Sequence, residues 1–294
     1  MNNYKNKFLI GSDPEFMVVD AHNHIVSCVG LLPGYKEEPF DIGQGCSVQV
    51  DNVMAEFCLP PTNDPVKFHD SLKYALEAGR QMLPKGYNFL CKASHSYPEN
   101  ELNTDRAKEF GCEPDYNPYH TYDRDSDSFL PALVMNTKPT SSDPNLRSCG
   151  GHIHVDLTKS VCDYLESGFM PTIQVLNRMA VLLDYHLGIP SLLLDSDKQR
   201  RLLYGKAGAY RPKEYGLEYR TLSNFWLQDL DLIKWVFDSV DYTITRFMEI
   251  NSFKNTIDNI ENIINEDMQE LAQNFTNDLV KQGYQMLTPI TINK

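Results

Sequence analysis

The sequence lacks the cysteine spacings that mark a zinc cage, a redox motif or a set of paired disulfides. Its seven cysteines are scattered and odd in number, and none of them form a C-x-x-C pair. We therefore expect most of them to be buried thiols. The sequence also has no Gly-x-x-x-x-Gly-Lys loop and no dinucleotide fingerprint, which argues against the two common nucleotide-binding folds.

Long apolar runs are absent as well. No stretch approaches the roughly 20 residues that a membrane-spanning helix needs, and the first ten residues lack the apolar core of a signal peptide. Because 41% of the residues are hydrophobic, the chain can still build a proper core. We expect a soluble, cytoplasmic, globular protein, and the sequence predicts no oligomeric state.

Positive charge is scarce, with 27 lysines and arginines against 40 acidic residues and a formal net charge of -13. Affinity for phosphate backbones and anionic membranes comes from an excess of basic residues, so neither nucleic acid nor membrane is an expected partner. An anionic substrate would have to be met by a local basic cluster. The best candidates crowd together between residues 198 and 220: Lys198, Arg200, Arg201, Lys206, Arg211, Lys213 and Arg220.

Strand patterns dominate the first part of the chain. Residues 8–19 and 25–29 predict a hairpin around a polar turn at 20–24, residues 46–59 predict further strand, and residues 87–93 predict a short buried strand. Asp64-Pro65 predicts a helix start, with one apolar face made of Val66, His69, Leu72, Ala75 and Leu76. Residues 94–148 show little periodicity and predict long loops that build a pocket wall.

Helical patterns dominate the second part. Three apolar stripes predict core-facing helices: Leu176, Met179, Leu183 and Leu187; Ile233, Val236, Phe237, Val240, Ile244 and Phe247; and Ile257, Ile260, Ile264, Leu271 and Phe275. No repeat, low-complexity tract or linker interrupts the chain. This organisation predicts one compact α+β domain with antiparallel strands.

Four short clusters are the most specific feature of the sequence: Asp13-Pro14-Glu15, Asp51 with Glu56, Gly150-Gly151-His152-Ile153-His154, and Glu218-Tyr219-Arg220. Hard divalent cations prefer carboxylate oxygens, and a phosphate under transfer prefers arginine. Because side chains alternate along a strand, we expect each of three pairs to share a face: Asp13 with Glu15, His152 with His154, and Glu218 with Arg220.

Local features of these clusters constrain where they lie. Pro14 cannot donate a ladder hydrogen bond, which places it at a sheet edge, a bulge or a strand end. Asp51 and Glu56 differ in parity, so both can face one cleft only if a turn or bulge lies between them. Taken singly, an Asp-Pro-Glu is usually a turn and a Glu-x-Arg pair is usually a surface salt bridge of small value. Their joint occurrence in this order favours a functional site.

In this order the clusters resemble those of glutamine synthetases and glutamate-cysteine ligases. The corresponding stretches here are Asp13-Pro14-Glu15, Glu56-Phe57-Cys58-Leu59-Pro60, Gly151-His152, the basic stretch from Arg200 to Arg211, and Glu218-Tyr219-Arg220. Further stretches are similar to the phage-encoded carboxylate-amine ligases of that superfamily: Gly11-Ser12-Asp13-Pro14-Glu15-Phe16, Phe110-Gly111-Cys112-Glu113-Pro114-Asp115 and Gly216-Leu217-Glu218-Tyr219-Arg220. The resemblance covers roughly residues 8–226, and the helical tail after Trp226 adds nothing diagnostic.

The resemblance implies a single glutamine synthetase-like ligase domain over residues 1–294. It would have a curved, mainly antiparallel sheet with helices packed on its outer face and a helical C-terminal part from about residue 227. The implied location is the cytoplasm, that of the host if a phage encodes the protein. The implied cofactors are ATP and two or three magnesium ions, with manganese as an alternative. The implied substrates are a small-molecule or peptide carboxylate and an amine.

The resemblance also assigns residues. Glu15 and Glu56, helped by Asp51, would hold the ion nearer the substrate carboxylate, and Asp13, His152 and Glu218 would hold the ion between the β- and γ-phosphates. Arg220 would face the transferred phosphoryl group, with Arg211 and one of Arg200 or Arg201 as further anion contacts. The implied catalytic residues are Arg220, Arg211 and Glu218. The nucleotide contacts would come from the basic residues Arg200, Arg201, Lys206, Arg211 and Arg220. Asp13 departs from the glutamate usual in the larger families, so its metal would sit closer to the backbone or be reached through water.

The residue types suit such a reaction. A carboxylate is a poor electrophile, so it first attacks the γ-phosphate of ATP to become an acyl phosphate, and an amine then displaces phosphate. Positioning and electrostatics supply most of the catalysis, which explains an inventory of carboxylates, a histidine and arginines without an obvious nucleophile.

Two other classes remain open at this stage. His22-Asn23-His24 and His152-Ile153-His154 could be the His-x-His pairs of a metal-dependent amidohydrolase that activates water. Against this, the first pair sits in a predicted turn and the alternating strand-helix pattern of a barrel is missing. A catalytically silent binding protein of the same fold is the other alternative. ATP turnover with candidate amines separates the three.

Overall fold

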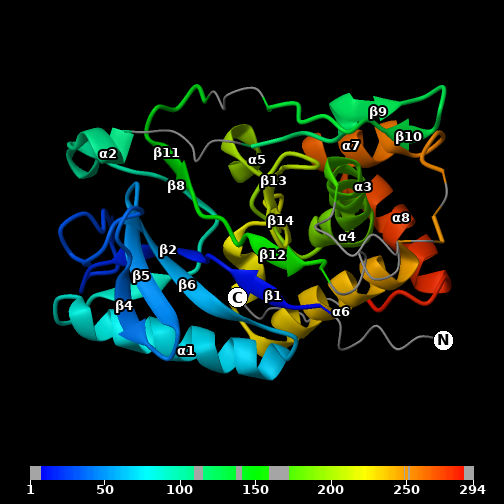
Figure 1. Cartoon of the computed structure of the whole chain (residues 1–294). Coiled ribbons are helices and arrows are strands. Elements are labelled where there is room, and N and C mark those ends of the chain that lie inside the picture. Colours follow the sequence, from blue (N-terminus) through cyan, green and yellow to red (C-terminus); the bar gives the residue numbers. More distant parts are fainter. Residues whose placement is uncertain are drawn as a thin grey trace.

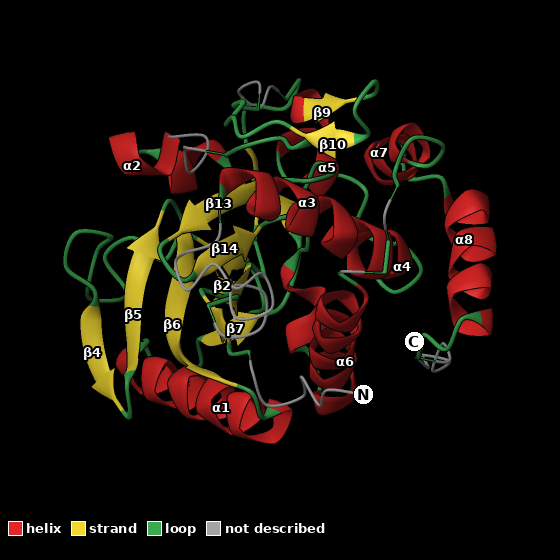
Figure 2. Ribbon diagram, turned by 45° about the vertical axis from the view of Figure 1, so that its right-hand side comes forward, coloured by secondary structure: helices red, strands yellow, loops and turns green. Residues whose placement is uncertain are grey.

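A computed structural model describes residues 8–108, 115–136, 141–158, 172–247, 249–250 and 252–287. The main sheet has ten strands, and the central order is β13-β14-β12-β1-β6-β2-β3, with β4 and β5 continuing from β6 and β7 pairing with β2. Its ladders are antiparallel throughout the described strands, as in the register Ile153↔Tyr219. The predicted α+β class with a curved antiparallel sheet is confirmed, and Figures 1 and 2 show the sheet curling above α1.

The strands of the main sheet are short, and their bounds are as follows: β1 (Ile10–Ser12), β2 (Glu15–Val19), β3 (Ile25–Val26), β4 (Phe40–Gly43), β5 (Cys46–Asp51), β6 (Met54–Thr62), β7 (Asn88–Leu90), β12 (Ile153–Asp156), β13 (Tyr210–Lys213) and β14 (Gly216–Tyr219). Two small ladders stand apart: β8 (Ser94–Ser96) with β11 (Leu146–Ser148), and β9 (Tyr122–Asp123) with β10 (Ser128–Phe129).

The helices are α1 (Pro65–Met82), α2 (Asp105–Lys108), α3 (Ile173–Leu183), α4 (Ile189–Ser191), α5 (Arg200–Leu203), α6 (Leu230–Arg246), α7 (Ile257–Asn265) and α8 (Gln269–Lys281). A π-helical turn at Asp184–Gly188 joins α3 to α4, and single 3₁₀ turns occur at Glu99–Leu102, Tyr119–Thr121 and Asn224–Leu227. Helix α1 packs against β6 and α6, and α3 packs against β14. In the part of the chain that the structure describes, no helix is long and apolar enough to cross a membrane.

The first predicted strand, residues 8–19, is divided at Asp13-Pro14 into β1 and β2. The backbone stays hydrogen-bonded at this interruption, because Phe57 N donates to Pro14 O at 3.0 Å and Glu15 N donates to Gly150 O at 3.1 Å. Pro14 thus lies at a strand end, as predicted. The break also separates Asp13 from Glu15, which were expected to share one strand face, and directs them to two neighbouring clusters.

A two-residue turn at Asn52-Val53 joins β5 to β6 and provides the condition required for Asp51 and Glu56 to meet. The strands pair as Asp51↔Met54 and Gln49↔Glu56. Asn52 has φ of 56°, a left-handed conformation that asparagine tolerates better than most residues. The predicted hairpin at 20–24 is also confirmed, since β2 pairs with β3 around it and His22 and His24 are exposed there.

Helix α1 begins as predicted, with the Asp64 side chain accepting from Val66 N at 2.9 Å. Its predicted apolar face is partly wrong. The buried residues are Phe68, Leu72, Ala75 and Gly79, whereas Val66 is 45% exposed. The face is rotated because Phe68 stacks on Trp226, with ring centroids 5.4 Å apart. The predicted buried strand at 87–93 is also shorter and less buried than expected, since β7 pairs on one side only, with β2.

The first two helical stripes are buried as predicted, in α3 with its π-helical extension and in α6. The third is wrong as a single stripe: the chain turns between α7 and α8, where Asp267 has φ of 50°, and Leu271 is half exposed.

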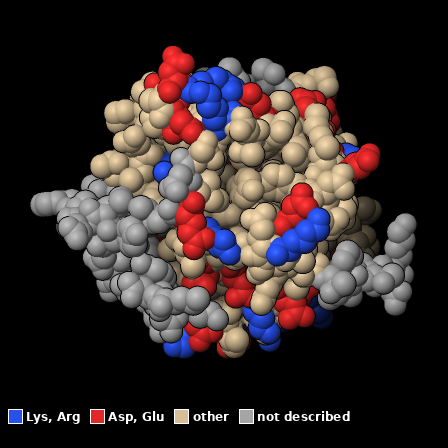
Figure 3. Space-filling view, turned by 90° about the vertical axis from the view of Figure 1, so that its right-hand side faces the viewer, with Lys and Arg blue, Asp and Glu red and all other residues tan. Residues whose placement is uncertain are grey.

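Of the described cysteines, three are buried, Cys91 is partly buried and Cys58 is exposed, and all five are free thiols. On the face shown in Figure 3, acidic and basic side chains stand in mixed groups.

Candidate functional site

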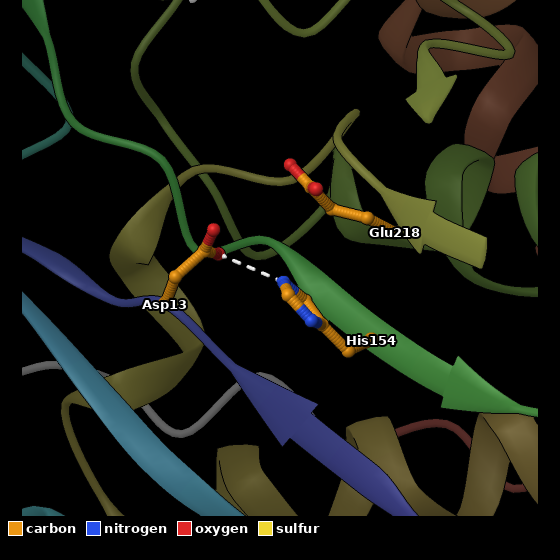
Figure 4. A group of neighbouring side chains, drawn as sticks. All are labelled: Asp13, His154 and Glu218. Carbon is orange, nitrogen blue, oxygen red and sulfur yellow. Dashed lines mark ion pairs between the residues drawn. The ribbon is translucent and has the colours of Figure 1, made fainter. Parts of the chain in front are cut away.

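The first site cluster gathers Asp13, His152, His154 and Glu218 where the end of β1 meets β12 and β14. The register Gly11↔His154 and His154↔Glu218 aligns these strands. Asp13 Oδ1 lies 3.2 Å from His152 Nδ1 and 3.4 Å from His154 Nε2. Ligand atoms of Asp13, His154 and Glu218 lie within 4.8 Å of one another, and Figure 4 shows Asp13 on the segment after β1, with His154 on β12 and Glu218 on β14.

Several atoms of this first cluster are buried without a hydrogen-bond partner in the described part of the chain: Asp13 Oδ1, His152 Nδ1 and His154 Nε2. Burial and the charge of Arg220 lower the pKa of His152, which favours the neutral imidazole that binds metals. Tyr215 OH lies 2.7 Å from His154 Nδ1 and so orients the ring with Nε2 toward Asp13. Buried donor atoms that face one another fit a cation placed between them.

The second site cluster consists of Glu15, Asp51 and Glu56, whose ligand atoms also lie within 4.8 Å of one another. The pairs Glu15↔Glu56 and Asp51↔Met54 bring them together around β6. Gly150 N donates to Glu15 Oε2 at 2.6 Å. Burial raises the pKa of Glu15 and of Glu56, and the negative charges of Asp13 and Asp51 raise both further. Crowded carboxylates of this kind suit a hard divalent cation, which prefers oxygen ligands.

Three cations meet the carboxylate of Glu218. Arg220 Nη1 donates to Glu218 Oε1, while Oε2 lies 2.8 Å from Lys213 Nζ and 3.2 Å from Arg211 Nη1. Burial and Asp13 raise the pKa of Glu218, but His152, Arg220 and Arg211 outweigh them and lower it to about 2. Asp115 stands beside this group, with Oδ1 3.7 Å from Arg220 Nε. Glu218 and Arg220 thus share a face, as strand alternation predicted.

The remaining basic residues of the predicted nucleotide site lie elsewhere. Arg200 is buried, and its guanidinium donates to the backbone oxygens of Cys149, Arg220 and Thr221 at 2.7 to 3.1 Å. Arg201 faces Asp267, with 3.5 Å between Nη1 and Oδ1. Lys206 is exposed. The structure therefore gathers Arg211 and Arg220 on Glu218 and does not bring these three to the same carboxylate.

Sequence reasoning missed two members of the site. Lys213 is one of the basic candidates between residues 198 and 220, but the resemblance assigns it no role. It stands two residues after Arg211 and so shares its strand face. The sequence gives no indication of a role for Tyr215, because its contact with His154 depends on the turn between β13 and β14. Of the stretch at residues 110–115, only Asp115 lies within the described residues.

Comparisons with known proteins support part of the predicted resemblance. Residues 141–279 match the family model described as Phage phiEco32-like COOH.NH2 ligase-type 2, which confirms the resemblance to phage-type carboxylate-amine ligases. The matched stretch includes His152, His154 and Glu218 and, contrary to expectation, extends through the helical tail after Trp226. No curated protein matches this sequence.

A solved structure shares the fold. The chain is similar to a structure described as a bifunctional glutathione synthetase from Pasteurella multocida, with a TM-score of 0.51 and 12% sequence identity. The match covers 96% of this chain and 45% of that chain, so the chain spans about half the length of that protein. At this level of identity the likeness concerns the fold alone.

Proposed function

We propose that the protein is an ATP-dependent carboxylate-amine ligase that forms an amide bond through an acyl phosphate. The observation that carries this proposal is the placement of two carboxylate clusters, each partly buried, on one sheet, with Arg211 and Arg220 paired to Glu218 of the first. The family match over residues 141–279 and the glutathione synthetase of similar fold both agree with an amide-forming ligase. We further propose that residues 1–294 form a single glutamine synthetase-like catalytic domain.

The residues present fit divalent cations. The first site cluster would hold one ion through Asp13, Glu218 and a histidine, and the second would hold another through Glu15, Asp51 and Glu56. Magnesium or manganese suits this oxygen-rich donor set better than a soft metal does. When bound, the ions would neutralise the negative charge of the ATP phosphates and of the substrate carboxylate as these approach.

The protein's own groups would perform the remaining work. Arg220, 2% exposed and fixed by Glu218, presents a planar cation to the γ-phosphoryl group, and Arg211 flanks it. The substrate carboxylate oxygen attacks the γ-phosphorus, and the bond to the ADP oxygen breaks. An amine nitrogen then attacks the acyl carbon, phosphate leaves, and the nitrogen loses a proton. Buried surroundings strengthen these electrostatic contacts and limit hydrolysis of the acyl phosphate.

We expect the purified protein to release ADP and phosphate from ATP only when magnesium or manganese is present, and faster with a suitable acid-amine pair. The reason is that the carboxylate clusters cannot receive a polyanionic substrate without added positive charge. Measuring nucleotide products by chromatography against a matrix of small carboxylates, peptides and amines tests this. Production of AMP and pyrophosphate would refute the acyl-phosphate route, and tightly bound zinc with ATP-independent hydrolysis would favour an amidohydrolase.

The two histidines should differ in their effect on metal use. The resemblance assigns the metal to His152, so His152→Ala should raise the magnesium concentration needed for half-maximal activity by about tenfold or more. His154→Ala should alter acid or amine selection, or stability, with the metal requirement unchanged. Titrating both variants against free magnesium decides the matter. A shift confined to His154→Ala would move the ligand one pleat along β12, to His154, whose ligand atom lies within 4.8 Å of those of Asp13 and Glu218.

A further inference from the structure

Glu218 presents a conflict that the proposed function does not resolve. As a metal ligand it needs a free lone pair directed at the cation, yet both of its oxygens contact protein cations: Oε1 meets Arg220, and Oε2 meets Arg211 and Lys213. A divalent ion and an ammonium on one carboxylate would stand only a few ångströms apart and repel each other. Binding of a metal to Glu218 therefore favours displacement of one of the three protein cations.

Lys213 is the cation best able to move. Its side chain is 28% exposed, against 17% for Arg211 and 2% for Arg220. It lies at the end of β13, which is the last strand in the order of the main sheet. The residue opposite is Gly216, which has no side chain to hold the lysine stem in place. A lysine also carries a compact charge on a flexible stem, whereas the arginine forks are held by geometry.

The position of Lys213 also offers it a second partner. It shares a face with Arg211, Glu218 and Arg220, and that face is where the proposed function places the phosphates. A displaced ammonium would remain within the same cleft, next to a newly arrived polyanion. Phosphate oxygens are strong acceptors for charged donors.

Building on the proposed function, we infer that Lys213 is a movable counter-ion. It neutralises Glu218 in the metal-free protein, leaves Glu218 when a divalent cation binds, and then contacts a phosphate of the nucleotide. Lys213 would thus link the two binding events: it opposes binding of the metal alone and favours binding of the metal-nucleotide complex. A lysine that only stabilises the fold would affect neither affinity in this way.

The test measures binding, not turnover, by calorimetry on the full chain. The first titration uses Mn²⁺ alone, and the second uses Mn²⁺ with a non-hydrolysable ATP analogue. For Lys213→Gln we expect the affinity for Mn²⁺ alone to rise about fivefold and the affinity for the metal-nucleotide complex to fall about fivefold, because one screened charge contact is lost in each state. Lys213→Arg, which keeps the charge, should fall between wild type and Lys213→Gln in both titrations.

Lys234→Gln is the matched control, since Lys234 is 44% exposed and pairs loosely with Asp231 at 3.6 Å on α6. It removes the same charge far along the chain and should change neither affinity. Thermal unfolding confirms that each variant is folded. If wild type binds Mn²⁺ but Lys213→Gln and Lys234→Gln bind it equally, the inference fails while the metal site stands. If wild type binds no divalent cation, the proposed function and the inference both fail.

Discussion

Glu56→Gln is expected to lower ligase turnover by about 10² to 10³-fold while raising the melting temperature of the metal-free protein. Loss of one charged ligand removes electrostatic stabilisation that acts where charge develops. The same substitution relieves repulsion, because burial and the charges of Asp13, Asp51 and Glu15 raise the pKa of Glu56. Turnover and thermal unfolding in a chelating buffer provide the two measurements.

The raised pKa values of Glu15 and Glu56 also predict how the stability of the metal-free protein changes with pH. A carboxyl whose pKa is raised by folding binds its proton more tightly in the folded state, so the stability present below its ordinary pKa is lost as pH rises through the raised value. The metal-free wild type should therefore lose melting temperature as the pH rises above 4.5, the ordinary pKa of a glutamate. Glu56→Gln should show a weaker loss over the same range, but not its disappearance, because Glu15 and other carboxyls with raised pKa values remain.

Added magnesium should make the wild type more stable than Glu56→Gln, the reverse of the order expected without metal. A ligand that binds only the folded state stabilises it more the more tightly it binds, with the logarithm of its affinity, so the melting temperature of wild type should rise more than that of Glu56→Gln. Glu77→Gln is a suitable control, because Glu77 is exposed on α1 and pairs with Arg80 at 2.7 Å; it should leave turnover unchanged. A Glu56→Gln protein that is less stable without metal and retains its turnover would assign Glu56 a structural role.

The parts of this site that sequence reasoning anticipated follow from periodicity and from local backbone chemistry. The parity of Asp51 and Glu56 required a turn between them, and Asn52 provides it. The missing donor of Pro14 required a sheet edge, a bulge or a strand end, and the strand is interrupted there. Such inferences depend only on residues that are close in the sequence, so they can be made without knowledge of the tertiary fold.

The parts that sequence reasoning missed depend on contacts between distant segments. Arg200 and Arg220 both stand in one basic stretch, yet Arg200 donates to backbone carbonyls of distant segments while Arg220 meets Glu218. Nothing in the local sequence distinguishes a guanidinium that orders backbone from one that faces a ligand. The stripe from Ile257 to Phe275 failed for a related reason, since Asp267 adopts a left-handed conformation that interrupts an otherwise helical apolar period.

This difference between two neighbouring arginines leads to the second large effect. Arg220→Lys keeps the positive charge but loses the planar fork that contacts two oxygens at once. A positioned arginine of this kind is worth about 10³ to 10⁵ in phosphoryl-transfer rates, and the retained charge offsets part of that, so we expect kcat to fall about 10² to 10³-fold. The KM for ATP should change only a few-fold, because the guanidinium acts mainly on the charge that develops during transfer.

Arg200→Lys is the matched comparison, and we expect it to lower stability more than kcat. Its guanidinium joins three backbone carbonyls around Cys149, Arg220 and Thr221, and a lysine cannot satisfy all three in that geometry. Buried acceptors left without donors cost about 1 to 3 kcal/mol each, so the main result should be a lower melting temperature with the kcat of the folded fraction reduced far less than in Arg220→Lys. Steady-state kinetics and thermal unfolding on both variants measure the contrast. If Arg200→Lys lowers kcat as much as Arg220→Lys does and leaves stability unchanged, Arg200 would be assigned to the phosphate site after all.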